Sequence, residues 1–212
     1  MEIQNKKINF LGDSITEGVG VSELSRNYVN TFLRKYAPAE ARNYGISGTR
    51  FARQQTPTAD HPEWDQDFCS RVALMDPDAD IVVVYGGVND HGHGDAPFGE
   101  PTDRTPDTFC GACHTLMRSL IERFPRATVV FMTPLHCIRE DRPNKRPYRD
   151  YVDAIIEAAN YYAIPVLDLY RTSGIQPQIP ILKETYIPDG VHPNDRGAER
   201  IADRLAAFLT AL

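Results

Sequence analysis

Long apolar runs are absent from this sequence: none approaches the roughly 20 residues that cross a bilayer, so we expect no membrane insertion. The first seven residues also lack the apolar segment of a secretory signal. A cytoplasmic location is therefore the expectation, unless a signal has been removed.

Dense runs of lysine and arginine are absent as well, and the formal net charge is -6. Nucleic-acid binding depends on clustered positive charge, so a nucleic-acid partner is not expected. An uncharged or weakly charged small substrate agrees better with this balance. The four cysteines are too few and too scattered for a disulfide-built scaffold and are compatible with reduced thiols.

What the sequence does contain is typical of a compact globular protein, with 42% apolar and 25% charged residues. Its 212 residues fit one domain, and no repeat, low-complexity segment or flexible linker divides it. The prediction is a single domain over residues 1–212. Nothing in the composition fixes its oligomeric state.

Short β-branched runs alternate with helical patterns along the chain. The runs predict buried strands at residues 8–11, 81–85, 128–132 and 164–168, and position alone suggests a further strand at 41–44. Apolar stripes predict helices near 29–36, 109–124, 152–159 and 198–209, with Thr105 and Asn194 as N-caps. This alternation predicts a doubly wound α/β fold with a mostly parallel sheet.

Ligands in such folds bind at the carboxyl ends of the strands, which is where the first motif lies. Gly12-Asp13-Ser14 follows the first strand and places a hydroxyl at that edge. By itself the motif is more typical of an ordinary turn. Two polar loops, residues 90–104 and 136–150, also follow predicted strands.

Asp189 and His192 stand three residues apart, just before the last predicted helix. A serine hydroxyl needs a base to take its proton, and a histidine base needs a carboxylate to fix its tautomer. One turn could supply both groups to Ser14. The alternative, a surface histidine beside a helix cap, fits this segment equally well when it is read alone.

Two further motifs offer hydrogen-bond donors at the same edge. Asn89, in Gly86-Gly87-Val88-Asn89-Asp90, could stabilise an oxyanion with its side-chain amide. After the weak second strand, a glycine N–H could join the Ser14 N–H, with Gly48 favoured over Gly45. Both segments are also compatible with plain turns.

Together the motifs resemble the SGNH (GDSL-type) hydrolases: Gly12-Asp13-Ser14, Gly48, Gly87-Val88-Asn89-Asp90 and Asp189-Gly190-Val191-His192 occur in the family's order. The resemblance covers essentially the whole chain, with isoleucine at position 15 where the family name has leucine. It implies a three-layer α/β/α, flavodoxin-like fold with five parallel strands.

The resemblance also implies roles: Ser14 as nucleophile, His192 as base, Asp189 as its support, and an oxyanion hole from Ser14, Gly48 and Asn89. The expected substrate-binding residues lie in or beside these motifs: Asp13, Gly87, Asp90 and Arg50. The expected activity is cleavage of small carboxylic esters, with short acyl groups such as acetyl groups on sugars favoured. No cofactor is expected.

Three other interpretations compete with this one. Asp90, His91, His93 and Asp95 could bind a metal, but their spacing matches no familiar zinc pattern, and a polar wall beside the site is favoured over a metal site. Cys110 and Cys113 have the spacing of a dithiol redox motif, but Cys113 belongs to the apolar stripe of a predicted helix, which favours core packing over redox function. A non-catalytic sugar- or acyl-binding module is the alternative function.

Arg53, Gln54 and Trp64 also follow the second strand and could line a substrate cleft, with Trp64 as a stacking surface for a sugar. They could equally be surface residues that pack against a helix. The sequence does not decide between these interpretations.

Overall fold

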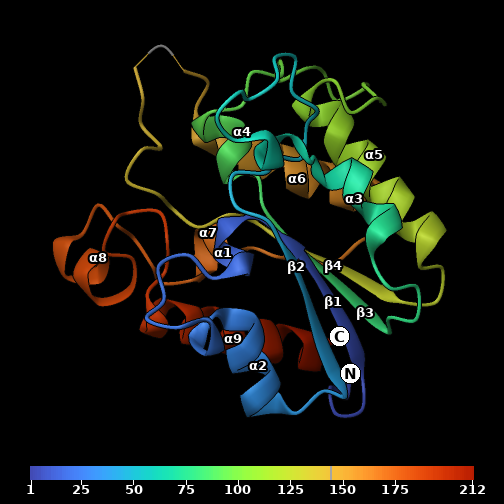
Figure 1. Cartoon of the computed structure of the whole chain (residues 1–212), viewed down its shortest axis with the longest axis vertical. Helices are drawn as coiled ribbons and strands as arrows, with labels where there is room; N and C mark the ends of the chain where they lie inside the picture. Colours follow the sequence, from blue (N-terminus) through green and yellow to red (C-terminus); the bar gives the residue numbers. More distant parts are fainter. Residues whose placement is uncertain (144) are drawn as a thin grey trace.

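The computed structural model describes residues 1–143 and 145–212, and within these it forms one five-stranded parallel sheet (Figure 1). Asn144, inside the loop predicted at 136–150, lies outside the described residues. The strand order is β2-β1-β3-β4-β5, and the strands are β1 (Lys7–Gly12), β2 (Glu40–Gly45), β3 (Ile81–Tyr85), β4 (Thr128–Met132) and β5 (Val166–Leu167). The predicted doubly wound fold is confirmed.

The strands differ in burial in the way their sequences suggest. Every residue of β3 is buried, because this central strand is covered on both faces. The weak strand β2 is confirmed as a partly exposed edge strand, which explains its polar composition. β5 is shorter than predicted: Pro165 has no N–H to donate, although its carbonyl accepts from Phe131 N at 3.2 Å.

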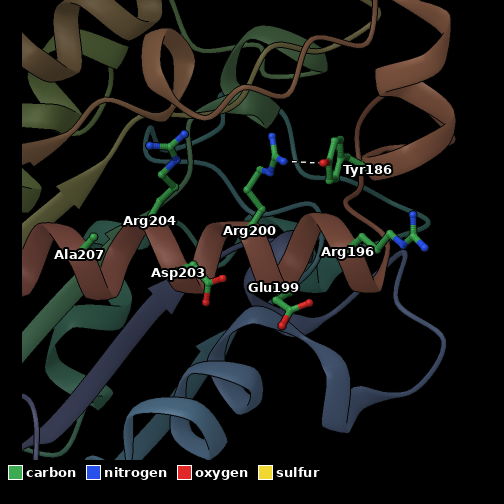
Figure 2. A pocket seen from close by; sticks show the side chains of 7 residues that line it. All are labelled: Tyr186, Arg196, Glu199, Arg200, Asp203, Arg204 and Ala207. Carbon is green, nitrogen blue, oxygen red and sulfur yellow. Dashed lines mark hydrogen bonds between the residues drawn. The ribbon is translucent and has the colours of Figure 1, made fainter.

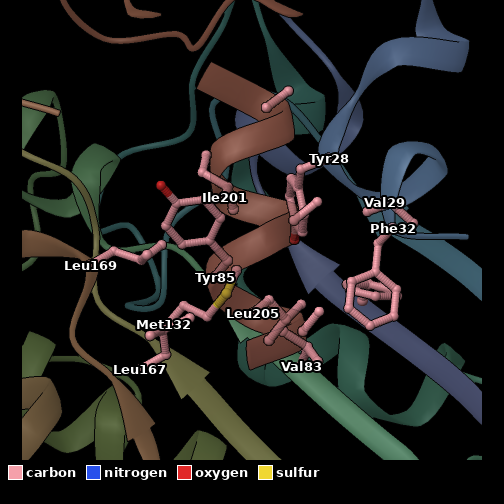
Figure 3. Close-up of a cluster of buried hydrophobic side chains, with 14 of the residues drawn as sticks. Tyr28, Val29, Phe32, Val83, Tyr85, Met132, Leu167, Leu169, Ile201 and Leu205 are labelled. Atoms are coloured by element: carbon pink, nitrogen blue, oxygen red, sulfur yellow. The ribbon is translucent and has the colours of Figure 1, made fainter. Parts of the chain in front are cut away.

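One face of the sheet is covered by α2 (Tyr28–Tyr36) and α9 (Asp195–Ala211) (Figure 1). Asn194 caps α9 as predicted, accepting a hydrogen bond from Gly197 N at 3.1 Å. Figure 3 shows how the two helices meet the strands in a continuous apolar cluster, which includes Tyr28, Val29, Phe32, Val83, Tyr85, Met132, Leu167, Ile201 and Leu205.

The opposite face is covered by α3 (Phe68–Arg71), α5 (Phe109–Arg123) and α6 (Tyr148–Tyr161). α5 begins later than the sequence suggested: its N-cap is Thr108, whose hydroxyl accepts from Gly111 N at 3.1 Å. The predicted cap at Thr105 is therefore wrong, because a second threonine nearer the apolar stripe makes this bond.

Two short helices start directly after the central strands: α1 (Ser14–Glu17) follows β1, and α4 (Val88–Gly92) follows β3. β1 and β3 are adjacent and parallel, with Gly12 paired with Tyr85, so both helices begin at the same edge of the sheet.

The remaining elements are α7 (Leu169–Thr172), α8 (Pro180–Tyr186) and three 3₁₀ turns at Leu24–Arg26, Pro62–Asp65 and Val72–Leu74. None of the helices in the described parts of the chain has the length and apolar character needed to cross a membrane.

Candidate active site

Ser14 is the first residue of α1, directly at the carboxyl end of β1. Asp13 caps this helix by accepting a hydrogen bond from Ile15 N at 3.0 Å. A side chain at Gly12 would lie 1.9 Å from the Thr16 hydroxyl oxygen, so only glycine allows the turn to pack this closely. The turn leaves Ser14 largely buried, with its side chain lining a cavity.

His192 and Asp189 reach Ser14 from the turn that precedes α9. His192 Nε2 is 3.0 Å from Ser14 Oγ, and His192 Nδ1 is 2.7 Å from Asp189 Oδ2. With the ring proton on Nδ1, the imidazole donates to Asp189 and accepts from the Ser14 hydroxyl. The three residues predicted to act together are therefore joined by hydrogen bonds in the expected order.

The Asp189 carboxylate is held firmly within its own turn. Its Oδ1 atom accepts from Val191 N at 2.8 Å and from His192 N at 2.7 Å. Partial burial raises the pKa of Asp189, but these two bonds and the histidine ring outweigh it, so the net shift is downward. Asp189 is therefore ionised at neutral pH and can stabilise a positive charge on His192.

Gly48 and Asn89 line the same cavity as Ser14. Gly48 has a φ of +73°, and a side chain there would lie 2.3 Å from the Trp64 indole. Within the described residues no acceptor pairs with the Gly48 N–H. The Gly45 N–H donates to Asn43 Oδ1 at 2.8 Å, so Gly48 is the glycine with a donor to offer.

A buried arginine fixes the loops around this edge. Arg71 donates to the carbonyls of Tyr44 (2.8 Å) and Gly12 (3.1 Å) and to the Thr49 hydroxyl (2.9 Å). Burial lowers the pKa of Arg71 to about 10, which leaves it charged at neutral pH. It joins the ends of β1 and β2 to the loop that carries Gly48, a role that no motif in the sequence indicates.

The cavity in front of Ser14 has a volume of about 400 Å³. One part of its wall is apolar and the rest is polar or basic. Its lining comprises Ser14, Val19, Ser47, Gly48, Trp64, Val88, Asn89, His91, Gly92, His93, Cys137, Arg139, Arg142, Asp189, Val191 and His192.

Trp64 lines the cavity, which is one of the two placements that the sequence leaves open, and it is stacked on His61 with ring centroids 4.2 Å apart. Arg53 and Gln54 do not line it. Arg53 is exposed and pairs with Asp107 at 3.3 Å. Cys137, Arg139 and Arg142 also line the cavity, although the sequence indicates no more than a polar loop in this part of the chain.

None of the four residues predicted to bind substrate lines the cavity: Asp13, Gly87, Asp90 and Arg50. Asp90 is buried and accepts from Phe51 N and Ala52 N, both at 3.0 Å. Burial raises the pKa of Asp90 to about 7 and that of Asp13 to about 6. The expectation of direct substrate contact is corrected for both aspartates, because each is turned into backbone hydrogen bonds.

Arg50 and Gly87 also lie outside the cavity lining and contact the elements that form it. Arg50 is buried and donates to Asp65 Oδ1 at 3.0 Å and to the Trp64 carbonyl at 3.1 Å, so it positions the loop that carries Trp64. Gly87 is the N-cap of α4 and has a φ of +106°, and a side chain there would lie 3.1 Å from Ile155.

The expected polar wall is present, since His91 and His93 both line the cavity. Asp95 is directed elsewhere and accepts from Gln55 N and Thr56 N, both at 2.8 Å. Across residues 1–143 and 145–212, no cluster of three or more histidine, cysteine or acidic side chains is arranged to hold a metal ion.

Cys110 and Cys113 lie inside α5 and are buried. Burial raises the pKa of the Cys110 thiol to about 11 and that of Cys113 well above its usual value. Such thiols are poor nucleophiles, which agrees with the prediction that they pack the core.

A second hollow of about 590 Å³ lies along α9 (Figure 2). Figure 2 shows Arg200 directed toward Tyr186, to whose hydroxyl it donates at 2.5 Å. The hollow is lined by Tyr186, Arg196, Glu199, Arg200, Asp203, Arg204 and Ala207. It contains no serine, cysteine or histidine, so the cavity at Ser14 is the candidate active site.

Comparisons with known proteins identify solved structures that share this fold. One solved structure, 33% identical, covers 100% of this chain and 99% of its own with a TM-score of 0.88. A protein from Lactobacillus plantarum is 28% identical, with a TM-score of 0.87 over 99% of this chain and 98% of that one. A lipase/acylhydrolase from Enterococcus faecalis shares the fold at 22% identity, with a TM-score of 0.66 over 97% and 96% of the two chains.

No curated protein matches the chain. The GDSL-like lipase/acylhydrolase family matches it over residues 10–200, a range that includes Ser14, Gly48, Asn89, Asp189 and His192. The chain therefore belongs to the GDSL-like lipase/acylhydrolase family, a family of hydrolases.

Proposed function

We propose that this hydrolase cleaves carboxylic esters of small molecules through an acyl-enzyme on Ser14. The observation that carries the proposal is the hydrogen-bond chain from Ser14 Oγ through His192 to Asp189, at 3.0 and 2.7 Å, inside a cavity that also exposes Gly48 and Asn89. Nucleophile, base and supporting carboxylate are the three parts that such chemistry requires.

In the first half of the reaction, His192 Nε2 takes the proton of Ser14 as Oγ attacks the ester carbonyl carbon. Asp189 stabilises the imidazolium that forms. The negative charge on the carbonyl oxygen is stabilised by the N–H groups of Ser14 and Gly48 and by the side-chain amide of Asn89. The tetrahedral intermediate then collapses, and the alcohol leaves with the proton from His192.

The second half repeats these steps with water as nucleophile. His192 takes a proton from the water as its oxygen attacks the acyl carbonyl, and the same donors hold the oxyanion. Collapse breaks the bond to Ser14 Oγ, which regains its proton from His192. The products are a carboxylic acid and the free enzyme.

The cavity favours short acyl groups. Its volume of about 400 Å³ is at the small end of ordinary ligand pockets. Val19, Val88 and Val191 supply apolar contacts for a few methylene groups, while Ser47, His91 and His93 supply polar contacts. This balance suits a short acyl ester of a polar alcohol, such as an acetylated sugar.

The test is a chain-length series of 4-nitrophenyl esters, from acetate to palmitate, assayed with the wild type and Ser14→Ala. We expect activity that declines with chain length and falls by at least about 10³-fold in Ser14→Ala. Circular dichroism confirms folding, and mass spectrometry after fluorophosphonate treatment should find the adduct on Ser14. Full activity in Ser14→Ala would overturn the proposal; equal turnover of long esters would overturn the short-acyl preference.

A further inference from the structure

Residues 137–142 place two arginines on one wall of the active-site cavity. Arg139 and Arg142 line the same cavity as Ser14. The segment is fixed at both ends: Ile138 N donates to the Gly190 carbonyl at 2.8 Å, and Arg142 donates to the Gly92 carbonyl at 2.8 Å. It therefore bridges the turn that carries His192 and the end of α4, which carries Asn89.

The positive charge of this wall is not balanced within the cavity. Asp189 is the one carboxylate among the described lining residues, and it is hydrogen-bonded to His192. Neither Arg139 nor Arg142 forms an ion pair with a carboxylate of residues 1–143 or 145–212.

The two acidic neighbours in the same segment lie outside the cavity lining. Glu140 pairs with His136 at 2.9 Å, and neither Glu140 nor Asp141 lines the cavity. After burial, the charges of both carboxylates raise the pKa of Tyr170, and the Glu140 charge offsets only part of the lowering of the pKa of His91.

Nearby positive charges also act on His91 and His93 in the cavity wall. Burial and then the charges of Arg50, Lys145 and Arg142 lower the pKa of His93 to about 4. Burial, Arg142 and Lys145 lower the pKa of His91 as well. Lys145 Nζ adds to the positive charge near the end of α4, where it donates to the carbonyls of His91 (3.2 Å) and Gly92 (3.3 Å). Both histidines are neutral at pH 7, so the positive potential comes from the arginines and the lysine.

We propose that the ester cleaved at Ser14 carries an anionic group, a carboxylate or phosphate, that binds against Arg139 and Arg142. The proposal rests on the ester hydrolase function and narrows its substrate class. Guanidinium groups bind both anions through paired N–H donors. The net charge of -6 is a property of the whole chain. The wall beside Ser14 is positively charged, so the local charge is the one that acts on a bound substrate.

The experiment compares matched esters that differ in one charge. On the acyl side, 4-nitrophenyl hydrogen glutarate is paired with 4-nitrophenyl methyl glutarate; on the alcohol side, 3-acetoxybenzoate is paired with methyl 3-acetoxybenzoate. After subtraction of spontaneous hydrolysis, we expect kcat/KM to favour the anionic ester about tenfold in at least one pair. The preferred pair identifies the half of the substrate that lies along the arginines.

Two variants test the assignment. Arg139→Gln/Arg142→Gln should lower the anionic-to-neutral ratio of kcat/KM about tenfold, and added NaCl should lower the wild-type ratio. Arg118→Gln, on α5 and outside the cavity lining, removes one exposed positive charge elsewhere on the protein and should keep the ratio.

The outcomes separate this inference from the function on which it rests. Hydrolysis of the neutral esters with no anionic preference in either pair overturns the inference and leaves the ester hydrolase function standing. A preference that survives in the double variant overturns the role of the arginines. Absence of hydrolysis of every ester by the folded wild type overturns the proposed function and this inference with it.

Discussion

Asn89 Nδ2 donates a 3.0 Å hydrogen bond to the carbonyl oxygen of Thr49, which joins α4 to the loop that carries Gly48. The bond fixes the orientation of the amide, so its nitrogen does not have to be ordered when substrate binds. An amide nitrogen has two hydrogens, and this bond uses one of them. The proposed oxyanion donors of Asn89 and Gly48 are thus held by one rigid connection.

Asn89→Ala should therefore lower kcat by about 10² to 10³-fold with a much smaller change in KM, because the lost donor acts mainly on the transition state. Steady-state kinetics on a short ester measure both constants. Asn160→Ala, an exposed asparagine on α6, is the matched control. A kcat within threefold of the wild type would remove Asn89 from the proposed oxyanion site.

Gly48→Ala should destabilise the protein and disturb the site together. Its φ of +73° costs a non-glycine residue about 1 to 2 kcal/mol, and its Cβ would lie 2.3 Å from the indole of Trp64. Adding Trp64→Ala should relieve the overlap but not the backbone cost. The double variant should therefore recover only part of the stability that Gly48→Ala loses.

Thermal unfolding compares the melting temperatures of Gly48→Ala and of the double variant Gly48→Ala/Trp64→Ala. Gly92→Ala serves as the control for stability, because a side chain there meets nothing within 4 Å and Gly92 is helical. Its melting temperature should equal or exceed that of the wild type. A Gly48→Ala protein as stable as Gly92→Ala would contradict the strained geometry.

Asp90 should make stability depend on pH. Burial raises its pKa in the folded protein to about 7 from an ordinary value of 3.8, so the folded state holds a proton that the unfolded state releases. The contribution of Asp90 to the free energy of unfolding should therefore fall as the pH rises from about 4 to 7, and it should stay constant above that range.

Urea denaturation of the wild type and Asp90→Asn at several pH values isolates this effect, because other titrating groups are common to both proteins. The wild type should lose stability relative to Asp90→Asn as the pH rises, by a few kcal/mol in total. A difference that is constant or grows in favour of the wild type would show that the Phe51 and Ala52 N–H bonds keep Asp90 ionised.

The fold was predictable where periodicity is strong. β1, β3 and β4 are buried, so their apolar runs define them, and α9 was predictable from its stripe and from Asn194. Position in an alternating α/β pattern was enough for β2, whose residues carry little strand signal. Helix starts were less secure, because Thr105 and Thr108 both satisfy the local rule and only packing selects Thr108.

The site was predictable as far as motifs define it. Ser14, His192 and Asp189 come together because their motifs end strands or precede helices at one edge of the sheet. Side-chain direction was not predictable: Asp13 and Asp90 neighbour Ser14 and Asn89 in sequence, yet both turn inward to backbone N–H groups. The arginines of residues 137–142 lie in a loop whose path depends on tertiary contacts.

The hydrogen bond between Ser14 and His192 joins residues 178 positions apart in the chain. Ser14 precedes His192 in the chain, so during synthesis the proposed nucleophile exists before its proposed base. On the proposed mechanism, a chain that lacks the turn at residues 189–192 has no base for Ser14 and should be inactive.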